Sequence, residues 1–178
     1  MEQHSENIQH FKCRKQYPNV IVPQRSRGYF GIGIEYPRTA ANIGTLWRSA
    51  HIMNADFMFV IGQCYKSVRT DTLKSWKHVP LFEYENFESF YKSLPKDAKL
   101  VGIELDKRSV PLTTYRHPQR AVYLLGSERD GLSAEAMKHC DEIIQIPGEF
   151  SLNVSAAGSI VLYDRLLKNG SFVQPHKG

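Results

Sequence analysis

The sequence predicts an α/β fold in which a mostly parallel sheet is covered by helices. Short apolar runs alternate with amphipathic segments from Gly28 onward, which is the pattern of parallel strands joined by covering helices. The chain has 178 residues, of which 42% are hydrophobic, and this is enough to build one core. No internal repeat, low-complexity tract or Pro-, Gly- or Ser-rich linker divides the sequence, so one main domain is expected.

The apolar runs are expected to form the strands, at residues 29–36, 57–62, 79–84, 99–105, 121–126 and 142–147. The amphipathic segments between and after them are expected to form helices, at residues 41–53, 86–94, 133–139 and 154–168. In the second of these helices Phe87, Phe90, Tyr91 and Leu94 share one face. Ser133 is expected to cap the N-terminus of the third.

The two ends of the chain differ from its centre. Residues 1–27 are basic and show no sustained apolar period, so we expect a flexible basic arm; a solvated tail without a role is the alternative. The main domain is predicted to cover residues 28–170, and residues 171–178 are predicted to be a short tail.

Composition restricts the classes of function. Lys and Arg number 23 against 18 Asp and Glu, and this net charge of +5 fits an anionic partner without requiring one. No apolar run reaches the roughly 18 residues of a membrane span, and the polar start "MEQHSENIQH" lacks the apolar centre of a signal peptide. A cytoplasmic protein without a membrane partner is therefore expected.

Cys13, Cys64 and Cys140 are widely spaced, which favours reduced thiols over a disulfide framework or a metal site.

Polar loops follow the first, fifth and sixth predicted strands, where ligands of open α/β sheets bind. In residues 39–50, Asn42 stands at a helix entrance and Arg48 lies on an otherwise apolar helical turn. In residues 125–133, two glycines bracket Glu128. In residues 146–155, Ser151 and Asn153 precede the last helix. We expect the loops to meet at one sheet edge and to line a nucleoside pocket.

Each of these loops also has a simpler interpretation. Asn42 can cap its helix while Arg48 extends to solvent. The sequence "GSERDGL" is also an ordinary turn between a strand and a helix. Ser151 and Asn153 are both common at helix starts, so simple capping of the last helix is the alternative there.

Taken in order, "NIGTLWRSA", "LLGSERDGLS" and "IP" followed by "SLNVSAAGSIVLYDRL" resemble the signature motifs of the SPOUT superfamily. More closely, they resemble those of the SpoU or TrmH type of RNA ribose 2'-O-methyltransferase. The resemblance spans about residues 28–168 and implies methyl transfer from S-adenosylmethionine to a ribose 2'-hydroxyl in RNA. It also implies a C-terminal deep trefoil knot and a homodimer in which the Arg of one subunit lies near the cofactor of the other.

The same resemblance assigns roles to individual residues. The positions matching the catalytic residues are Asn42, Arg48, Glu128, Ser151 and Asn153. Those matching the cofactor-binding positions are Leu125, Gly126, Ile146, Pro147 and Leu152. One departure is the segment Gly148 to Phe150, which is shorter than in typical members and leaves the contacts of that loop open. It is also consistent with a subfamily of different RNA preference.

The implied chemistry needs alignment more than it needs a metal. Methyl transfer from a sulfonium is an in-line displacement, in which positioning can contribute about 7–11 kcal/mol. A guanidinium keeps its proton in proteins, so we expect Arg48 to hold a phosphate and the ribose hydroxyl and to stabilise developing negative charge. Proton removal by Arg48, by a phosphate oxygen or by water remains open.

RNA contacts are expected outside the pocket. The segment 63–78 mixes basic and aromatic residues, which suits phosphate binding and base stacking; a solvated loop is the alternative. The predicted RNA-binding residues are Lys66, Arg69, Lys74, Trp76, Lys77, Arg14 and Lys15. The compact build slightly favours tRNA over rRNA as substrate.

Two other functions compete with this one. A catalytically idle RNA-binding protein of the same fold is disfavoured by the intact set of catalytic positions. A nicotinamide-dependent oxidoreductase is disfavoured because "GIGIEY" lacks the last glycine of the dinucleotide fingerprint.

Overall fold

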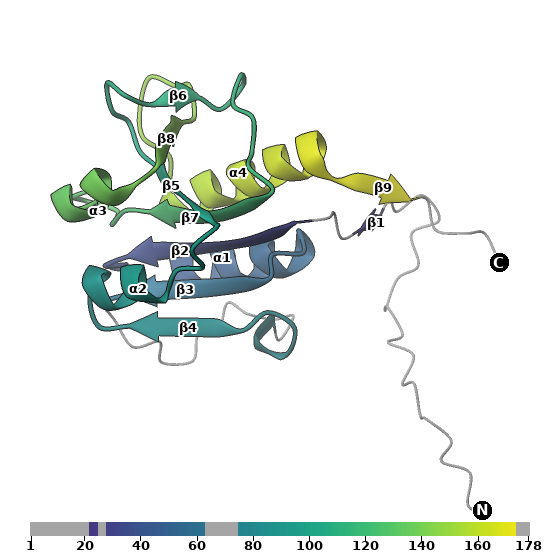
Figure 1. Cartoon of the computed structure of the whole chain (residues 1–178), viewed down its shortest axis with the longest axis horizontal. Coiled ribbons are helices and arrows are strands. Elements are labelled where there is room, and N and C mark those ends of the chain that lie inside the picture. Colours follow the sequence, from purple (N-terminus) through teal and green to yellow (C-terminus); the bar gives the residue numbers. More distant parts are fainter. Residues whose placement is uncertain (1–21, 25–27, 63–74, 174–178) are drawn as a thin grey trace, which may run out of the picture.

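The computed structural model of the chain describes residues 22–24, 28–62 and 75–173. Its centre is a seven-stranded sheet in the order β4-β3-β2-β7-β5-β8-β6, and every strand pair in it is parallel (Figure 1). The strands are β2 (Tyr29–Glu35), β3 (Phe57–Ile61), β4 (Leu81–Tyr84), β5 (Lys99–Ile103), β6 (Val110–Pro111), β7 (Arg120–Leu125) and β8 (Glu142–Gln145). The predicted α/β fold with a parallel sheet is confirmed.

Helices cover both faces of this sheet. On one face lie α1 (Ala40–Ile52) and α4 (Val154–Asn169), side by side, and on the other lie α2 (Phe87–Ser93) and α3 (Ala134–His139) (Figure 1). A short 3-10 helix, η1 (Ser75–Lys77), packs beside α1. Ser133 caps α3 through its hydroxyl, as predicted. No helix in the described part of the chain is long and apolar enough to cross a membrane.

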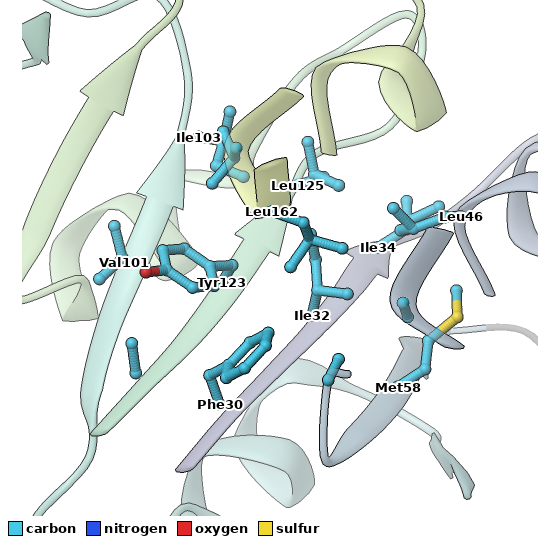
Figure 2. Close-up of a cluster of buried hydrophobic side chains, with 14 of the residues drawn as sticks. Phe30, Ile32, Ile34, Leu46, Met58, Val101, Ile103, Tyr123, Leu125 and Leu162 are labelled. Atoms are coloured by element: carbon cyan, nitrogen blue, oxygen red, sulfur yellow. The ribbon is translucent and has the colours of Figure 1, made fainter. Parts of the chain in front are cut away.

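The sequence "GIGI" in β2 is explained by packing. Ile32 and Ile34 point into the core beneath α1 and α4 (Figure 2), whereas Gly31 and Gly33 face the other side, opposite Phe57 and Phe59 of β3. A Cβ atom on Gly31 would lie 2.2 Å from the Phe57 ring, and one on Gly33 would lie 2.3 Å from the backbone oxygen of Phe59. These glycines therefore make room for aromatic rings and do not form a phosphate-binding turn.

Replacing Gly33 by alanine is expected to destabilise the protein by about 1–3 kcal/mol, because the added methyl overpacks the sheet against backbone atoms. For a chain of this length each kcal/mol lowers the melting temperature by roughly 2–4 °C, which calorimetry can resolve. Gly148→Ala is the control, since the nearest atom that its Cβ would meet is 3.5 Å away. Equal melting temperatures for the two variants would contradict this packing role.

Strand boundaries differ from the prediction at several places. The predicted strand 79–84 begins only at Leu81, because the backbone oxygen of Val79 accepts a hydrogen bond from Trp47 Nε1 of α1. The predicted strand 99–105 ends at Ile103, which leaves Glu104 in the following loop. The two-residue strand β6 was not predicted, because so short a segment shows no alternation.

The predicted arm and tail also meet. Strand β1 (Val22–Gln24) pairs antiparallel with β9 (Ser171–Val173), with Val22 opposite Val173. Residues 22–24 and 171–173, which the prediction assigned to a flexible arm and a short tail, are therefore paired strands. Strands of three residues lie below the length at which sequence periodicity is informative.

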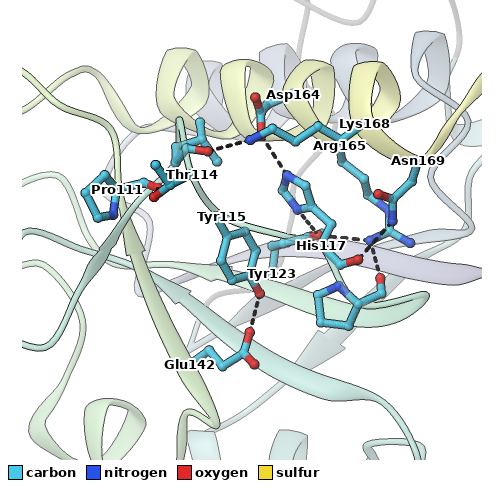
Figure 3. Close-up of polar contacts among 12 residues, drawn as sticks. Pro111, Thr114, Tyr115, His117, Tyr123, Glu142, Asp164, Arg165, Lys168 and Asn169 are labelled. Atoms are coloured by element: carbon cyan, nitrogen blue, oxygen red, sulfur yellow. Dashed lines mark hydrogen bonds and ion pairs between the residues drawn. The ribbon is translucent and has the colours of Figure 1, made fainter.

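The connection between β6 and β7 wraps the C-terminal half of α4 (Figure 3). Arg165 of α4 is buried, lies 4.5 Å from the centre of the Phe30 ring and donates to the Tyr123 hydroxyl. Arg165, Lys168 and Asn169 together donate to the backbone oxygens of Leu112, His117, Pro118 and Gln119. This connection fixes α4 against the sheet. The trefoil knot implied by the sequence stays a prediction.

His117 gives this region a pH dependence. Its ring lies 2.6 Å from the Tyr123 hydroxyl and 2.8 Å from Asp164 Oδ2 (Figure 3), and burial outweighs the effect of Asp164 to lower its pKa to about 4. The unfolded chain binds a proton at this position below about pH 6.5 and the folded chain does not. Stability is therefore expected to fall as the pH drops from about 6.5 to about 4. Urea unfolding at several pH values should show a flatter profile for His117→Gln; a profile parallel to the wild type would refute this assignment.

Candidate active site

A pocket of about 340 Å³ opens at the carboxyl edge of the sheet. Its walls are the loops after β5, β7 and β8 and the first turn of α4. Of the predicted cofactor-binding residues, four line it: Leu125, Gly126, Ile146 and Leu152. Pro147 is exposed and is not among the lining residues. Of the three loops expected to line a pocket at this edge, the second and third do so. Residues 39–50 contribute no lining residue and meet the other two loops through hydrogen bonds of Thr39 and Asn42.

Asn42, Glu128 and Asn153 form one hydrogen-bonded cluster beside the pocket. Asn42 Nδ2 donates to Glu128 Oε1 at 2.6 Å, and Asn42 Oδ1 accepts from Asn153 Nδ2 at 3.0 Å. Glu128 and Asn153 line the pocket, whereas Asn42 is 9% exposed and lies behind them. Ser151, another predicted site residue, also lines the pocket.

Glu128 is placed by a tight loop after β7. Ser127 and Gly131 exchange backbone hydrogen bonds of 3.0 and 3.1 Å, and Gly131 adopts the left-handed conformation with φ of 69° that closes the turn. Partial burial raises the pKa of Glu128, but its hydrogen bonds with Arg38 N, Asn42 and Thr39 N outweigh this effect and hold the pKa below its usual range. The carboxylate is therefore ionised at neutral pH.

Asn153 both caps a helix and takes part in the site. Its Oδ1 accepts from the backbone nitrogens of Ser155 and Ala156, at 3.0 and 3.3 Å, which caps α4. The other half of the amide donates to Asn42. The Ser155 hydroxyl adds a 2.7 Å hydrogen bond to Asn153 Oδ1 and was not predicted from the sequence. Capping of the last helix is confirmed for Asn153, and the cap fixes the orientation of its amide; the catalytic role stays a prediction.

Arg48 is not brought to the pocket of its own chain. It lies in α1, its side chain is exposed, and it is not among the lining residues. Nor does Asn42 cap α1, since the cap position is Thr39. The role of Arg48 near the cofactor of a second subunit, which the sequence implied, stays a prediction.

The pocket combines an apolar wall with negative charge. The charged residues lining it are Glu104, Glu128, Arg129 and Asp130, so carboxylates outnumber the cation. This lining suits a nucleoside-sized ligand with a positively charged group. In the described ranges no group of three or more His, Cys, Asp or Glu side chains could hold a metal ion. Burial raises the pKa of the Cys140 thiol to about 12, so this thiol is protonated and unreactive.

Of the predicted RNA-binding residues, Lys66, Arg69, Lys74, Arg14 and Lys15 lie outside the residues that the structure describes. Trp76 and Lys77 lie in η1. Trp76 is 59% exposed, and Lys77 Nζ lies 5.2 Å from the centre of its ring. An exposed ring beside a cation is suited to stacking on a base next to a phosphate.

Glu104 is a candidate site residue that the sequence did not reveal, and Glu35 is a buried carboxylate on the other side of the same loop. Glu35, the last residue of β2, accepts hydrogen bonds from Ser133, and Glu104 accepts one from Leu132 N. Both glutamates lie within or at the end of apolar runs, and the predicted strand 99–105 placed Glu104 inside the sheet. The signal that could have revealed Glu104 is a carboxylate next to the end of a buried strand.

The SpoU rRNA Methylase family matches residues 30–163 of this chain. A tRNA/rRNA methyltransferase of Archaeoglobus fulgidus, itself uncharacterized, is 30% identical over 81% of this chain and 67% of its own length. A tRNA (guanosine(18)-2'-O)-methyltransferase of Mus musculus is 28% identical over 69% of this chain, which spans only 8% of that protein.

Among solved structures, the AdoMet-bound rRNA methyltransferase from Sinorhizobium meliloti superposes with a TM-score of 0.72. It is 25% identical, and the match covers 82% of this chain and 58% of that one. Most of this chain therefore has the same fold as part of that cofactor-bound enzyme.

Proposed function

Because the match over residues 30–163 shows that the chain belongs to the SpoU rRNA methylase family, we propose that it transfers a methyl group from S-adenosylmethionine to a ribose 2'-hydroxyl of RNA. The observation that carries this proposal is the cluster of Asn42, Glu128 and Asn153 at the rim of a nucleoside-sized pocket. The S-adenosylmethionine cofactor and the methylation of RNA are properties of this family.

The pocket residues fit this cofactor. Leu125, Ile146 and Leu152 offer apolar surface for the adenosyl group, and Glu128 and Asp130 offer negative charge near a sulfonium cation. S-adenosylmethionine supplies an activated methyl group whose leaving group departs uncharged at sulfur. The protein therefore has to bind and align the acceptor hydroxyl rather than stabilise a leaving group.

In this proposal the polar cluster positions the acceptor. The ionised Glu128 fixes the amide of Asn42, and the cap on α4 fixes Asn153. Because each side chain is already hydrogen-bonded, the cluster loses little side-chain freedom when substrate arrives. Such preorganisation is the main source of rate in a displacement of this kind, where alignment is worth about 7–11 kcal/mol.

A homodimer would complete the site with Arg48. Apolar side chains are exposed on adjacent α1 and α4: Ile52 at 53%, Ile160 at 41%, Tyr163 at 52% and Leu167 at 53%. Apolar surface of this kind on neighbouring helices favours association with a second copy. Arg48 is exposed on α1, so a partner docked on these helices could receive it beside its own pocket.

For the RNA, we propose tRNA before rRNA, with the basic N-terminal residues Arg14 and Lys15 and the helix η1 adding contacts outside the pocket, in a cytoplasmic protein. The relatives named above include a tRNA enzyme and an rRNA enzyme, so the choice needs a direct test.

That test incubates the purified protein with methyl-labelled S-adenosylmethionine and separate pools of unmodified tRNA and rRNA. The proposal predicts label in RNA, more in the tRNA pool, and none with a Glu128→Ala control. Cofactor binding without label in either pool would point to a missing partner or to an assembled substrate. Absence of cofactor binding would instead favour the idle RNA-binding alternative.

A further inference from the structure

Two glutamates hold the loop after β7 from opposite sides. Strand β7 lies between β2 and β5 (Figure 1), and Glu35 ends β2 while Glu104 directly follows β5. Glu35 Oε2 accepts from the backbone nitrogen of Ser133 at 2.8 Å, and Glu104 Oε2 accepts from the backbone nitrogen of Leu132 at 2.9 Å. The two carboxylates therefore bind consecutive backbone amides.

The two glutamates differ in their position relative to the pocket. Glu35 is 1% exposed, and its second oxygen is bound by the Ser133 hydroxyl at 2.7 Å, outside the pocket. Glu104 lines the pocket, and its Oε1 accepts from the backbone nitrogen of Leu105 at 2.9 Å. One carboxylate thus joins the loop after β5 to the loop after β7, and these loops form two of the pocket walls.

The approach of Glu104 depends on the glycine beside it. A Cβ atom on Gly131 would lie 2.4 Å from Glu104 Oε2, and Gly131 has a positive φ of 69°. The loop that presents Glu128 therefore closes directly against the Glu104 carboxylate.

We propose that Glu104 is a positioning residue that preorganises the cofactor pocket by fixing Leu105, which lines the pocket, and Leu132, which directly follows the lining residue Gly131. This inference rests on the proposed function and adds a residue to its site. A carboxylate can accept both amide hydrogens, whereas a glutamine side chain has one oxygen and turns its NH₂ group toward the other donor. The change from Glu to Gln keeps the size of the side chain and removes the bridge.

The experiment compares Glu104→Gln with Glu35→Gln, the matched change on the other side of the same loop. In the cofactor-free protein, amide hydrogen exchange of Leu105 or Leu132 should accelerate in Glu104→Gln, and exchange of Ser133 should accelerate in Glu35→Gln. Calorimetry should show S-adenosylmethionine binding weakened roughly tenfold in Glu104→Gln and less than about threefold in Glu35→Gln. At saturating cofactor, kcat of Glu104→Gln should stay within about twofold of wild type, because the substitution should mainly raise the KM for S-adenosylmethionine.

Equal weakening in both variants, in step with their melting temperatures, would overturn the proposal, because it would show a structural role only. Unchanged exchange at both Leu105 and Leu132 would also overturn it. If Glu104→Gln does not fold, Glu104→Asp, which retracts the carboxylate by one methylene, replaces it in the same comparison. If the wild-type protein binds no S-adenosylmethionine, the proposed function itself is refuted. If the wild-type protein binds S-adenosylmethionine and Glu104→Gln binds it equally well, only the role of Glu104 is refuted.

Discussion

Replacing Arg48 by alanine is expected to lower methyl transfer by a factor of roughly 10²–10³ while leaving S-adenosylmethionine binding unchanged. In the proposed dimer Arg48 stabilises the RNA that reacts at the partner's pocket. Arg48 does not line the cofactor pocket of its own chain, so its loss should leave cofactor binding in place. Arg48→Lys should recover little of the activity, because an ammonium group lacks the planar fork that holds two oxygens at once. Single-turnover kinetics with saturating cofactor measures this loss; an Arg48→Lys enzyme with full activity would refute the role assigned to the guanidinium.

A mixing experiment tests whether Arg48 acts on the partner. Arg48→Ala has an intact pocket, and Asn42→Ala has an intact Arg48, so a mixed dimer of the two contains one complete site. Random reassociation of two inactive variants should restore roughly a quarter of the wild-type activity. No recovery in a mixture shown to contain mixed dimers would mean that Arg48 serves its own chain.

Replacing Asn42 by alanine is expected to reduce both activity and stability. Asn42 is 9% exposed and is the only link in the described cluster that bonds to both Glu128 and Asn153. Its removal takes away the acceptor of Asn153 Nδ2 and one of the hydrogen-bond donors to Glu128. This loss costs about 1–3 kcal/mol of unfolding free energy, and methyl transfer should fall by a factor of roughly 10² or more. Denaturant unfolding and initial rates measure the two effects.

Ser49→Ala provides the control for Asn42. Ser49 also lies in α1 and hydrogen-bonds to α4, through Ser159 Oγ at 2.7 Å, but it does not line the pocket. This variant should lose some stability and keep wild-type kcat. If Ser49→Ala lost as much activity as Asn42→Ala, the effect would come from the packing of α1 on α4 and not from the polar cluster.

The elements with a long apolar pattern could be predicted from the sequence, and the shortest ones could not. The helices α1 and α4 lie within two residues of the predicted ranges, because their apolar faces repeat over several turns. Strands β1, β6 and β9 have two or three residues each and carry no periodic signal. Each of them is defined by its pairing: β6 pairs with β8, and β1 and β9 pair with each other.

The residues that meet at the pocket could be predicted from the sequence, but the hydrogen bonds between them could not. The motifs indicated Asn42, Glu128 and Asn153 separately, while their hydrogen bonds depend on β7 lying between β2 and β5. The same topology explains why Glu104 was missed. Its carboxylate accepts from a backbone amide 28 residues away, so the end of a buried strand could mark Glu104 as a candidate but could not reveal this contact.

The position of the transferred methyl group tests the proposed ribose 2'-O-methylation directly. RNA methylated by the wild-type protein with labelled cofactor is hydrolysed in alkali, which cleaves every linkage except one that follows a 2'-O-methylated ribose. If the protein methylates the ribose 2'-hydroxyl, the label appears in an alkali-resistant dinucleotide. Label recovered in mononucleotides would place the methyl group on a base and would contradict ribose 2'-O transfer by this site.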